Sequence, residues 1–300
     1  MRFWINALAT SWAYFLNIFP VKLLWFFAKA FSWLWFDVLR IRRWTVLKNL
    51  TIAFPEKSKE ERMRLARLSM QHLCFGFFEF GLIPLMNKKW IDERAIFHGL
   101  DNYEKALAQG KGLLLLSLHM GNGDVGVAAL TLKGIRFNLI SKKFKNSIAN
   151  EFWFGVREKM GTRFLQPHGK NLAFDILKAT KRNEGVIFVI DQFMGRPYGI
   201  ETTFFGKKTG SAYGLSLFAL KTGAPVLPIY AYRDEDLKTH IVFEQSLEID
   251  PDDDEIANNN QDKDLQIQRL TQKYNDRVES IVRAHPEQWM WVHRRWKLWE

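Results

Sequence analysis

The chain has 300 residues, of which 47% are hydrophobic, and it carries 43 lysines and arginines against 32 aspartates and glutamates, a net charge of +11. This length is sufficient for one large α/β domain or for two smaller ones, each with a substantial core. The single cysteine, Cys74, excludes an intramolecular disulfide. The basic balance indicates an anionic partner, and nucleic acid, anionic lipid headgroups and an acidic protein are all candidates at this point.

The N-terminal segment is exceptionally aromatic, since 13 of the 44 aromatic residues lie between positions 3 and 36. Tryptophan at this density is typical of a membrane interface. Residues 3–21 form an uncharged run of 19 residues, which is long enough to span a bilayer. A second apolar stretch, interrupted by two lysines, follows it. We therefore predict that residues 1–39 form a membrane anchor, as one span or as two membrane-embedded or interfacial helices, and that residues 40–300 form a second domain.

A cleaved signal peptide is the competing interpretation of this segment. Bulky aromatic residues are atypical of the apolar core of a signal peptide, and no convincing small-residue cleavage site follows the run. The basic residues just after the anchor, Arg40, Arg42, Arg43 and Lys48, favour a cytoplasmic location for the rest of the chain by the positive-inside rule.

The remainder of the chain alternates helical and strand patterns. Ser58 and Glu61 have the spacing of a capping box and predict a helix to about Pro84, with Cys74 packed inside it. Further strands are predicted at residues 112–118, 135–140, 185–190 and 225–231, and further helices at 147–160, 170–181, 211–222 and 263–284. This alternation predicts an α/β fold with a mostly parallel sheet flanked by helices, which binds ligands at the carboxyl ends of its strands.

Residues 250–264 contain seven acidic residues and one lysine, a local charge of −6, so the rest of the chain carries +17. Clustered acidic residues in a polar segment predict an exposed, solvated loop. A metal site is the less favoured interpretation of this cluster.

The segment from His119 to Asp124 is the most informative part of the chain, because it follows the apolar run 113–118 directly. A buried strand that stops at a histidine can bring the imidazole and the carboxylate of Asp124 into contact at a sheet edge. The carboxylate would accept from one ring nitrogen and leave the other free to take a proton from an attacking hydroxyl. The alternative is an ordinary loop in which the ring satisfies a nearby carbonyl. Ser117 is not favoured as a nucleophile, because it lies within the strand and outside a G-x-S-x-G turn.

The chain resembles the lipid A biosynthesis acyltransferases, the late lauroyl/myristoyl transferase branch of the glycerolipid acyltransferase group. The resemblance extends from the N-terminal anchor to the C-terminus. It rests on Asn49-Leu50 with Phe54-Pro55, the H-x4-D motif from His119 to Asp124, Lys145-Asn146, Arg157, Gly161, Asp191-Gln192, Phe204-Phe205-Gly206, residues 222–228, and the ending from His285 to Lys297.

This resemblance implies an O-acyltransferase that moves a fatty acyl chain from an acyl thioester, expected to be acyl carrier protein, to a hydroxyl of a lipid A precursor. It implies no cofactor and no metal, and a location on the inner membrane with the catalytic domain facing the cytoplasm. The catalytic pair would be His119 and Asp124. Substrate-binding roles are implied for Asn122, Lys145, Asn146, Arg157, Asp191 and Gln192.

The charge of the chain agrees with this resemblance, because acyl carrier protein, membranes and phosphorylated lipid A precursors are all acidic. Nucleic acid is not expected as a partner, since the aromatic residues concentrate in the anchor and do not interleave with lysine and arginine on one surface. The alternative function is that of a related acyl-CoA-dependent acyltransferase that acts on a phospholipid or another glycolipid.

Overall fold

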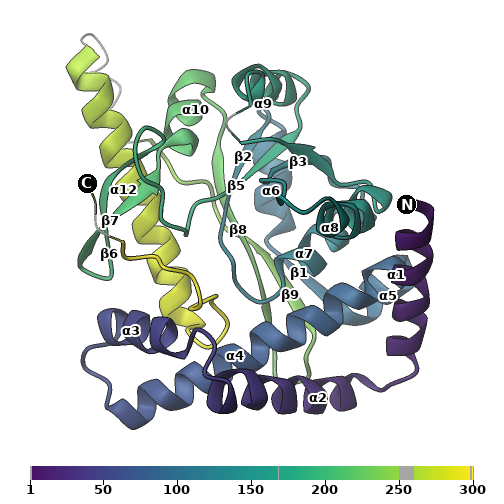
Figure 1. Cartoon of the computed structure of the whole chain (residues 1–300). Coiled ribbons are helices and arrows are strands. Elements are labelled where there is room, and N and C mark those ends of the chain that lie inside the picture. Colours follow the sequence, from purple (N-terminus) through teal and green to yellow (C-terminus); the bar gives the residue numbers. More distant parts are fainter. Residues whose placement is uncertain (1, 168, 250–259, 298, 300) are drawn as a thin grey trace.

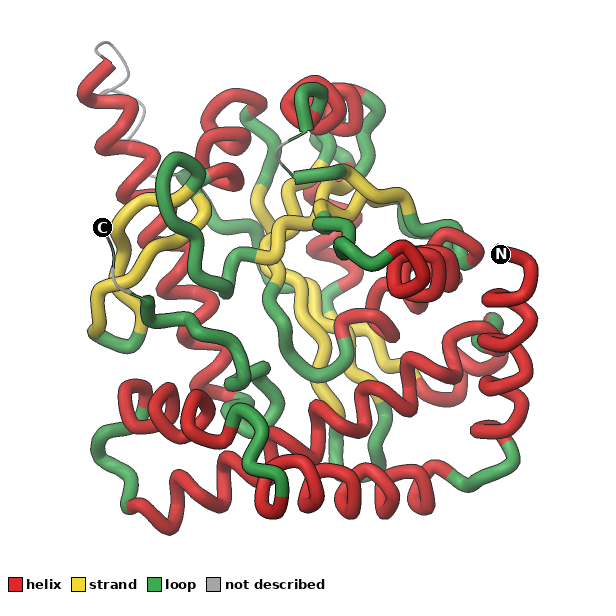
Figure 2. The backbone as a smooth tube through the Cα atoms, viewed as in Figure 1, coloured by secondary structure: helices red, strands yellow, loops and turns green. Residues whose placement is uncertain are grey.

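The structure is a computed structural model that describes residues 2–167, 169–249, 260–297 and 299. A seven-stranded sheet runs through its centre, and helices cover both faces (Figures 1 and 2). The strands are β1 (Ala95–His98), β2 (Leu113–Ser117), β3 (Phe137–Ile140), β4 (Arg163–Leu165), β5 (Gly185–Val189), β8 (Val226–Arg233) and β9 (Thr239–Phe243). A separate hairpin consists of β6 (Gly199–Phe204) and β7 (Lys207–Ala212).

The helices before the first strand are α1 (Arg2–Asn17), α2 (Val21–Trp33), the π-helical turn η1 (Leu34–Val38), α3 (Arg43–Ala53), α4 (Lys59–Leu82), the 3-10 turn η2 (Ile83–Leu85) and α5 (Lys88–Arg94). Those after it are α6 (Leu100–Leu107), α7 (Gly123–Leu132), α8 (Ser147–Lys159), α9 (Leu172–Lys181), α10 (Gly214–Thr222) and α12 (Asn260–Ala284).

The strands of the large sheet follow the order β1-β9-β8-β2-β5-β3-β4. The pairs from β8 to β4 are all parallel, whereas β9 runs antiparallel to β8 and carries β1 parallel to itself. The predicted α/β fold with a mostly parallel sheet is therefore confirmed, and the four predicted strands correspond to β2, β3, β5 and β8. The predicted helix at 211–222 begins later, at Gly214, because Ser211 and Ala212 pair in β7.

Different helices bury the two faces of the sheet. Leu114 and Leu116 of β2 join an apolar cluster with α9, α10 and α12, whereas Leu113 and Leu115 join a cluster with α5, α6 and α7. This alternation is required by the geometry of a strand, whose successive side chains point to opposite faces. All four leucines are fully buried, and each burial contributes about 1.5–3 kcal/mol relative to exposure. The strand that leads to His119 is therefore firmly anchored in the core.

The N-terminal region forms two helices that meet at a sharp bend. Between residues 4–17 and 21–38 the helical direction changes by 108°, so residues 3–21 do not form one straight helix. Pro20, which immediately precedes α2, is well suited to this position because a proline fits the start of a helix and not its interior. Both helices pack against α4, where Leu16, Leu24 and Cys74 belong to one buried cluster.

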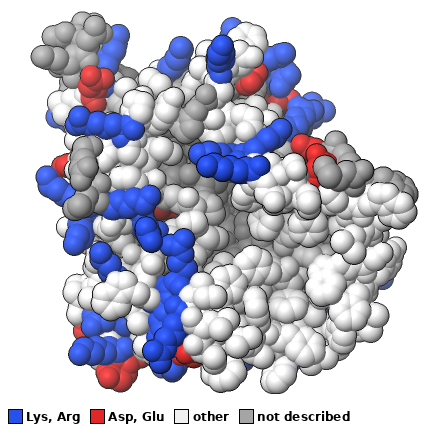
Figure 3. Space-filling model, in the orientation of Figure 1, with Lys and Arg blue, Asp and Glu red and all other residues white. Residues whose placement is uncertain are grey.

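The outer surface of these helices is apolar. Trp4, Phe26 and Trp33 have exposed fractions of 73%, 61% and 61%, and this face of the molecule is nearly free of charge over α1 and α2 (Figure 3). Within the described residues, one continuous helix, Lys59–Leu85, is long and apolar enough to cross a membrane, and half of its most apolar window is buried in the protein. The membrane anchor and the division at residue 39 stay predictions.

Two further predictions concern helices. The capping box of α4 is confirmed, because the Ser58 side chain accepts from the Glu61 amide while the Glu61 side chain accepts from the Ser58 amide, and Cys74 is buried as predicted. The predicted acidic loop is wrong for residues 260–264, which form the first turn of α12. Its remaining residues, 250–259, lie outside the described part of the chain.

Candidate active site

His119 and Asp191 lie side by side at the carboxyl edge of the sheet. Strands β2 and β5 are parallel neighbours in which Ser117 pairs with Val189, so the next two residues of each strand bring His119 opposite Asp191. The Nδ1 atom of His119 lies 2.8 Å from Oδ1 of Asp191, and the backbone N–H of His119 donates to Oδ2 at 2.9 Å. This is the edge at which the sequence analysis expects ligands to bind.

The electrostatics of the pair set the state of the imidazole. Burial tends to raise the pKa of Asp191, but the His119 ring, its hydrogen bonds and the Nε1–H of Trp289, which donates at 2.8 Å, together lower that pKa. Burial tends to lower the pKa of His119, yet the charge and hydrogen bond of Asp191 raise it above its ordinary value. An ionised Asp191 therefore holds the proton of His119 on Nδ1, which leaves a lone pair on Nε2.

Asp124 occupies a different place from the one that the H-x4-D motif predicts. Its carboxylate forms an ion pair with Arg157 of α8, and the His119 N–H is donated to Asp191. The cause is local, because Asp124 lies in the first turn of α7 and Arg157 faces that turn with a side chain that is almost fully buried. The charge of Asp124 still contributes to the raised pKa of His119. The predicted direct contact between His119 and Asp124 is wrong, and Asp191 takes that position.

Asn122 fixes the loop that connects His119 to α7. Its side-chain oxygen accepts from the backbone N–H groups of Asp124 and Val125 at 3.1 and 3.3 Å, which caps the helix. Its amide donates to the Glu79 carboxylate at 2.9 Å and to the Gly76 carbonyl at 3.2 Å. The structure thus gives Asn122 a role in positioning the loop, and its implied contact with substrate stays a prediction.

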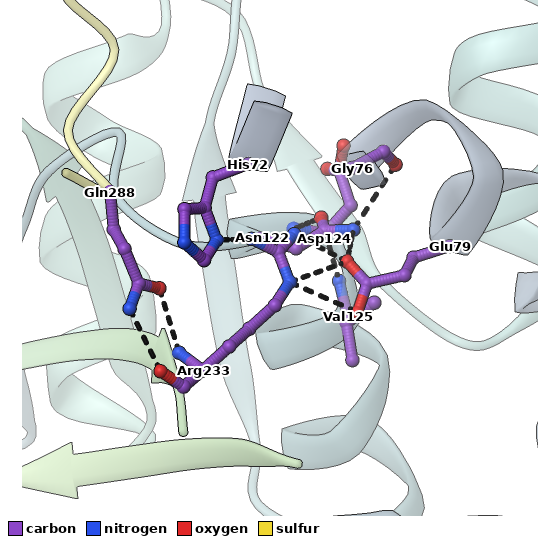
Figure 4. A network of polar contacts seen from close by, with 8 residues as sticks. All are labelled: His72, Gly76, Glu79, Asn122, Asp124, Val125, Arg233 and Gln288. Atoms are coloured by element: carbon purple, nitrogen blue, oxygen red, sulfur yellow. Dashed lines mark hydrogen bonds and ion pairs between the residues drawn. The ribbon is translucent and has the colours of Figure 1, made fainter. Parts of the chain in front are cut away.

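A buried ion pair between Glu79 and Arg233 holds the carboxylate to which Asn122 donates (Figure 4). The Nε atom of Arg233 lies 3.1 and 3.0 Å from the two carboxylate oxygens of Glu79, and Nη2 donates to the same carboxylate. The backbone of Arg233 exchanges two hydrogen bonds with the Gln288 side chain at 2.7 and 2.8 Å. The backbone N–H of Gly121 donates to the backbone carbonyl of Gln288 at 3.0 Å. This network connects α4 and β8 to the loop after His119.

The C-terminal segment 288–295 contacts both halves of the pair, which sequence reasoning missed. Trp289 donates to Asp191, and the Met290 N–H donates to the His119 carbonyl at 3.1 Å. The buried Arg295 donates to the Gln192 carbonyl at 3.3 Å. The available signal was the dense aromatic and basic run that follows the last predicted helix, a composition that is unusual for a free terminus.

The remaining predicted site residues divide into two groups. The amide nitrogen of Gln192 lies 3.2 Å from Nε2 and 3.3 Å from Nδ1 of His119, so Gln192 belongs to the same site. Asn146 caps α8 by accepting from the Ala149 N–H at 2.9 Å, and Lys145 is exposed beside it. The structure therefore brings Gln192, but neither Lys145 nor Asn146, into contact with His119.

This arrangement suits one kind of chemistry. A histidine with its Nδ1 proton held by a carboxylate can accept a proton at Nε2 from a hydroxyl group that attacks an electrophile. Because 34% of the His119 side chain is exposed, a substrate can approach the ring. The face of the molecule drawn in Figure 3 has a hollow at its centre, with lysine and arginine side chains along part of its rim.

Comparison with known proteins shows that this protein is an O-acyltransferase. The chain belongs to the bacterial lipid A biosynthesis acyltransferase family, whose sequence profile matches residues 1–298. The resemblance noted from the motifs is therefore confirmed.

Several relatives define the range of similarity. A lipid A biosynthesis palmitoleoyltransferase from Escherichia coli is 25% identical over 303 residues, which covers 99% of this chain and 92% of the relative. A lipid A biosynthesis acyltransferase from Haemophilus influenzae is 23% identical, with 81% and 72% covered. A phosphatidylinositol mannoside acyltransferase from Mycobacterium tuberculosis is 26% identical, with 71% and 64% covered. The crystal structure of a 1-acyl-sn-glycerophosphate acyltransferase from Thermotoga maritima matches with a TM-score of 0.34 at 12% identity, covering 93% and 98%, too weakly to add to the assignment.

Proposed function

We propose that this protein transfers a fatty acyl chain from an acyl thioester to a hydroxyl group of a lipid A precursor, with His119 as the general base. The family supports the acceptor, because the match spans nearly the whole chain. The observation that carries the mechanism is the 2.8 Å contact between His119 Nδ1 and Asp191, since it leaves Nε2 as the basic atom.

The reaction follows from this geometry. Nε2 of His119 takes the proton of the acceptor hydroxyl as its oxygen attacks the thioester carbonyl carbon, which forms the new C–O bond. The C–S bond then breaks, and the imidazolium returns the proton to the thiolate as the free thiol leaves. Asp191 stabilises the imidazolium through its ion pair, and no covalent enzyme intermediate is needed.

The second carboxylate and the arginine have supporting roles in this proposal. Asp124 contributes its negative charge to the raised pKa of His119, and so stabilises the imidazolium without touching it. The Arg157 guanidinium lies 4.7 Å from the Trp153 ring centroid and is paired with Asp124, which holds the Asp124 carboxylate at the start of α7. Arg157 of α8, together with Lys145 and Asn146 directly before that helix, would bind the anionic groups of the substrates.

The donor is proposed to be acyl carrier protein, and the site of action the inner membrane with the catalytic face toward the cytoplasm. The charge of +17 outside residues 250–264 suits both an acidic donor and an anionic bilayer. The apolar outer surface of α1 and α2 would face the lipid, because tryptophan is enriched at membrane interfaces and phenylalanine inserts favourably into the apolar part of the bilayer.

A direct experiment compares donors and acceptors with purified protein. Acylated acyl carrier protein should be a faster donor than acyl-CoA to a lipid A precursor. Its rate advantage should shrink as the salt concentration rises, because at physiological ionic strength salt screens the attraction between exposed charges that are more than about 8 Å apart. Product formation only on a phospholipid or a mannosylated lipid would contradict the proposal and favour the alternative, to which the mycobacterial relative points.

A further inference from the structure

A second histidine, His293, reaches the active site from the C-terminal segment. Its Nε2 atom lies 3.0 Å from the amide nitrogen of Gln192. The rings of His119 and His293 have centroids 5.5 Å apart and are tilted by 48°. The Gln192 carboxamide thus lies between two imidazoles, and only one of them belongs to the proposed base.

The two contacts of Gln192 differ in kind. Its amide nitrogen is almost equally far from both ring nitrogens of His119, at 3.2 and 3.3 Å. An atom at these distances lies above the ring and not in the ring plane, so the in-plane lone pair of Nε2 stays open to a substrate hydroxyl. The contact with His293 involves a single nitrogen and is an ordinary hydrogen bond from the amide N–H to Nε2.

The C-terminal segment fixes both ends of Gln192. Arg295 donates to the backbone carbonyl of Gln192 at 3.3 Å, and His293 accepts from the side-chain amide of Gln192. The segment is itself held, because the buried Asn49 donates to the backbone carbonyls of Trp291 and His293 at 2.7 and 2.6 Å. Position 293 is therefore set by contacts independent of any substrate.

We infer that His293 is a positioning residue for acyl transfer, which holds the Gln192 carboxamide over His119 with one amide proton directed to His293 and the other toward the reacting atoms. This second N–H group can donate to the thioester carbonyl oxygen, on which negative charge collects during the attack. The inference rests on the proposed function, since it assigns a role within the same reaction.

The surroundings keep His293 able to accept. Burial and the neighbouring charges of His119 and Arg42 lower its pKa, and Asp191 opposes this shift only in part. Its Nε2 therefore stays unprotonated at neutral pH, including when His119 carries the proton of the acceptor hydroxyl. A protonated His293 would present a second donor to the amide and release it.

The test is a double-mutant cycle in the full-length protein, with turnover of an acyl thioester and a lipid A precursor as the readout. His293→Phe keeps the bulk of the ring and removes the acceptor, so kcat should fall about 10-fold, the factor that one hydrogen bond carries, with KM unchanged. His293→Gln restores an acceptor oxygen at nearly the same reach and should recover most of the rate. Gln192→Ala combined with His293→Phe should be no slower than Gln192→Ala alone.

His285→Phe is the matched control, because His285 lies in the same C-terminal run but stacks on Tyr232 at 4.2 Å, away from Gln192. It should leave kcat unchanged. An active wild-type protein whose His293→Phe variant turns over at the wild-type rate would overturn the inference, as would fully additive losses in the cycle. A wild-type protein that acylates no lipid A precursor would instead contradict the proposed function.

Discussion

Replacing Asp191 with asparagine should remove the ability of His119 to accept a proton at Nε2 while leaving the fold intact. Asp191 accepts three hydrogen bonds: from the His119 ring at Oδ1, and from the His119 backbone N–H and Trp289 at Oδ2. In the variant, the amide oxygen satisfies two donors if it takes the Oδ2 position. The amide nitrogen then faces Nδ1 of His119, which must become an acceptor, and the ring proton moves to Nε2. The nitrogen that should accept from the substrate is then blocked.

The size of this effect follows from the hydrogen-bond count. The blocking orientation keeps all three contacts as hydrogen bonds, whereas the opposite orientation keeps only the contact with the His119 ring and places an N–H group against two N–H donors. At about 1 kcal/mol per bond, this difference of about 2 kcal/mol favours the blocking orientation about 30-fold. Loss of a general base typically costs a factor of about 10² to 10⁴. We therefore expect kcat to fall by about 10² or more, with little change in the melting temperature.

The pH dependence of kcat/KM separates this explanation from a general loss of structure. Asp191 raises the pKa of His119 against the effect of burial, and the base acts when neutral, so the acid limb of the wild type should lie above pH 6.5, the ordinary pKa of histidine. Without the charge of Asp191 the pKa of His119 falls, and the residual activity should show an acid limb at lower pH. The control, Asp124→Asn, should lose activity but shift the limb less. A variant at position 191 with near-normal turnover, or an unmoved acid limb, would refute the reasoning.

The other predictions test the supports of the site. Glu79→Ala leaves the buried Arg233 without its carboxylate partner and should lower the free energy of unfolding by about 3–5 kcal/mol, as measured by chemical unfolding. The control, Glu60→Ala, removes only an exposed charge in the first turn of the same helix and should change the free energy of unfolding by less than about 1 kcal/mol. Equal stabilities of the two variants would contradict the role of the ion pair. Replacing Trp4, Phe26 and Trp33 together by glutamate should release the protein from anionic vesicles in a sedimentation assay without altering its circular dichroism, and unchanged binding would argue against lipid contact at α1 and α2.

The sheet was largely predictable because its central strands are continuous apolar runs. Leu113 to Leu116 can only be a buried strand or a buried helix, and the short length and flanking glycine favour the strand. The edge strands β1 and β4 have four and three residues, too few to give a periodic signal. In strand β9 burial alternates, with Thr239, Ile241 and Phe243 buried, but its sequence, two polar residues followed by three apolar ones, shows no alternation of hydrophobicity.

The site was predictable at His119 and less so at its partner. A motif lists residues that are close in sequence, and Asp124 is the nearest carboxylate along the chain. The actual contact depends on the register of two parallel strands, which places Asp191 opposite His119. Both residues follow strand ends by the same number of positions, and that equivalence was the available clue. The contribution of Trp289 and His293 depends on a C-terminal segment that folds back, which no local pattern shows.

The most direct test of the central claim is mass spectrometry of lipid A from source cells that lack the protein, complemented with either the wild type or His119→Ala. The account predicts that the deletion removes the mass of one secondary acyl chain, that the wild type restores it, and that His119→Ala at equal membrane abundance does not. A lipid A spectrum unaffected by the deletion, or one fully restored by His119→Ala, would contradict it.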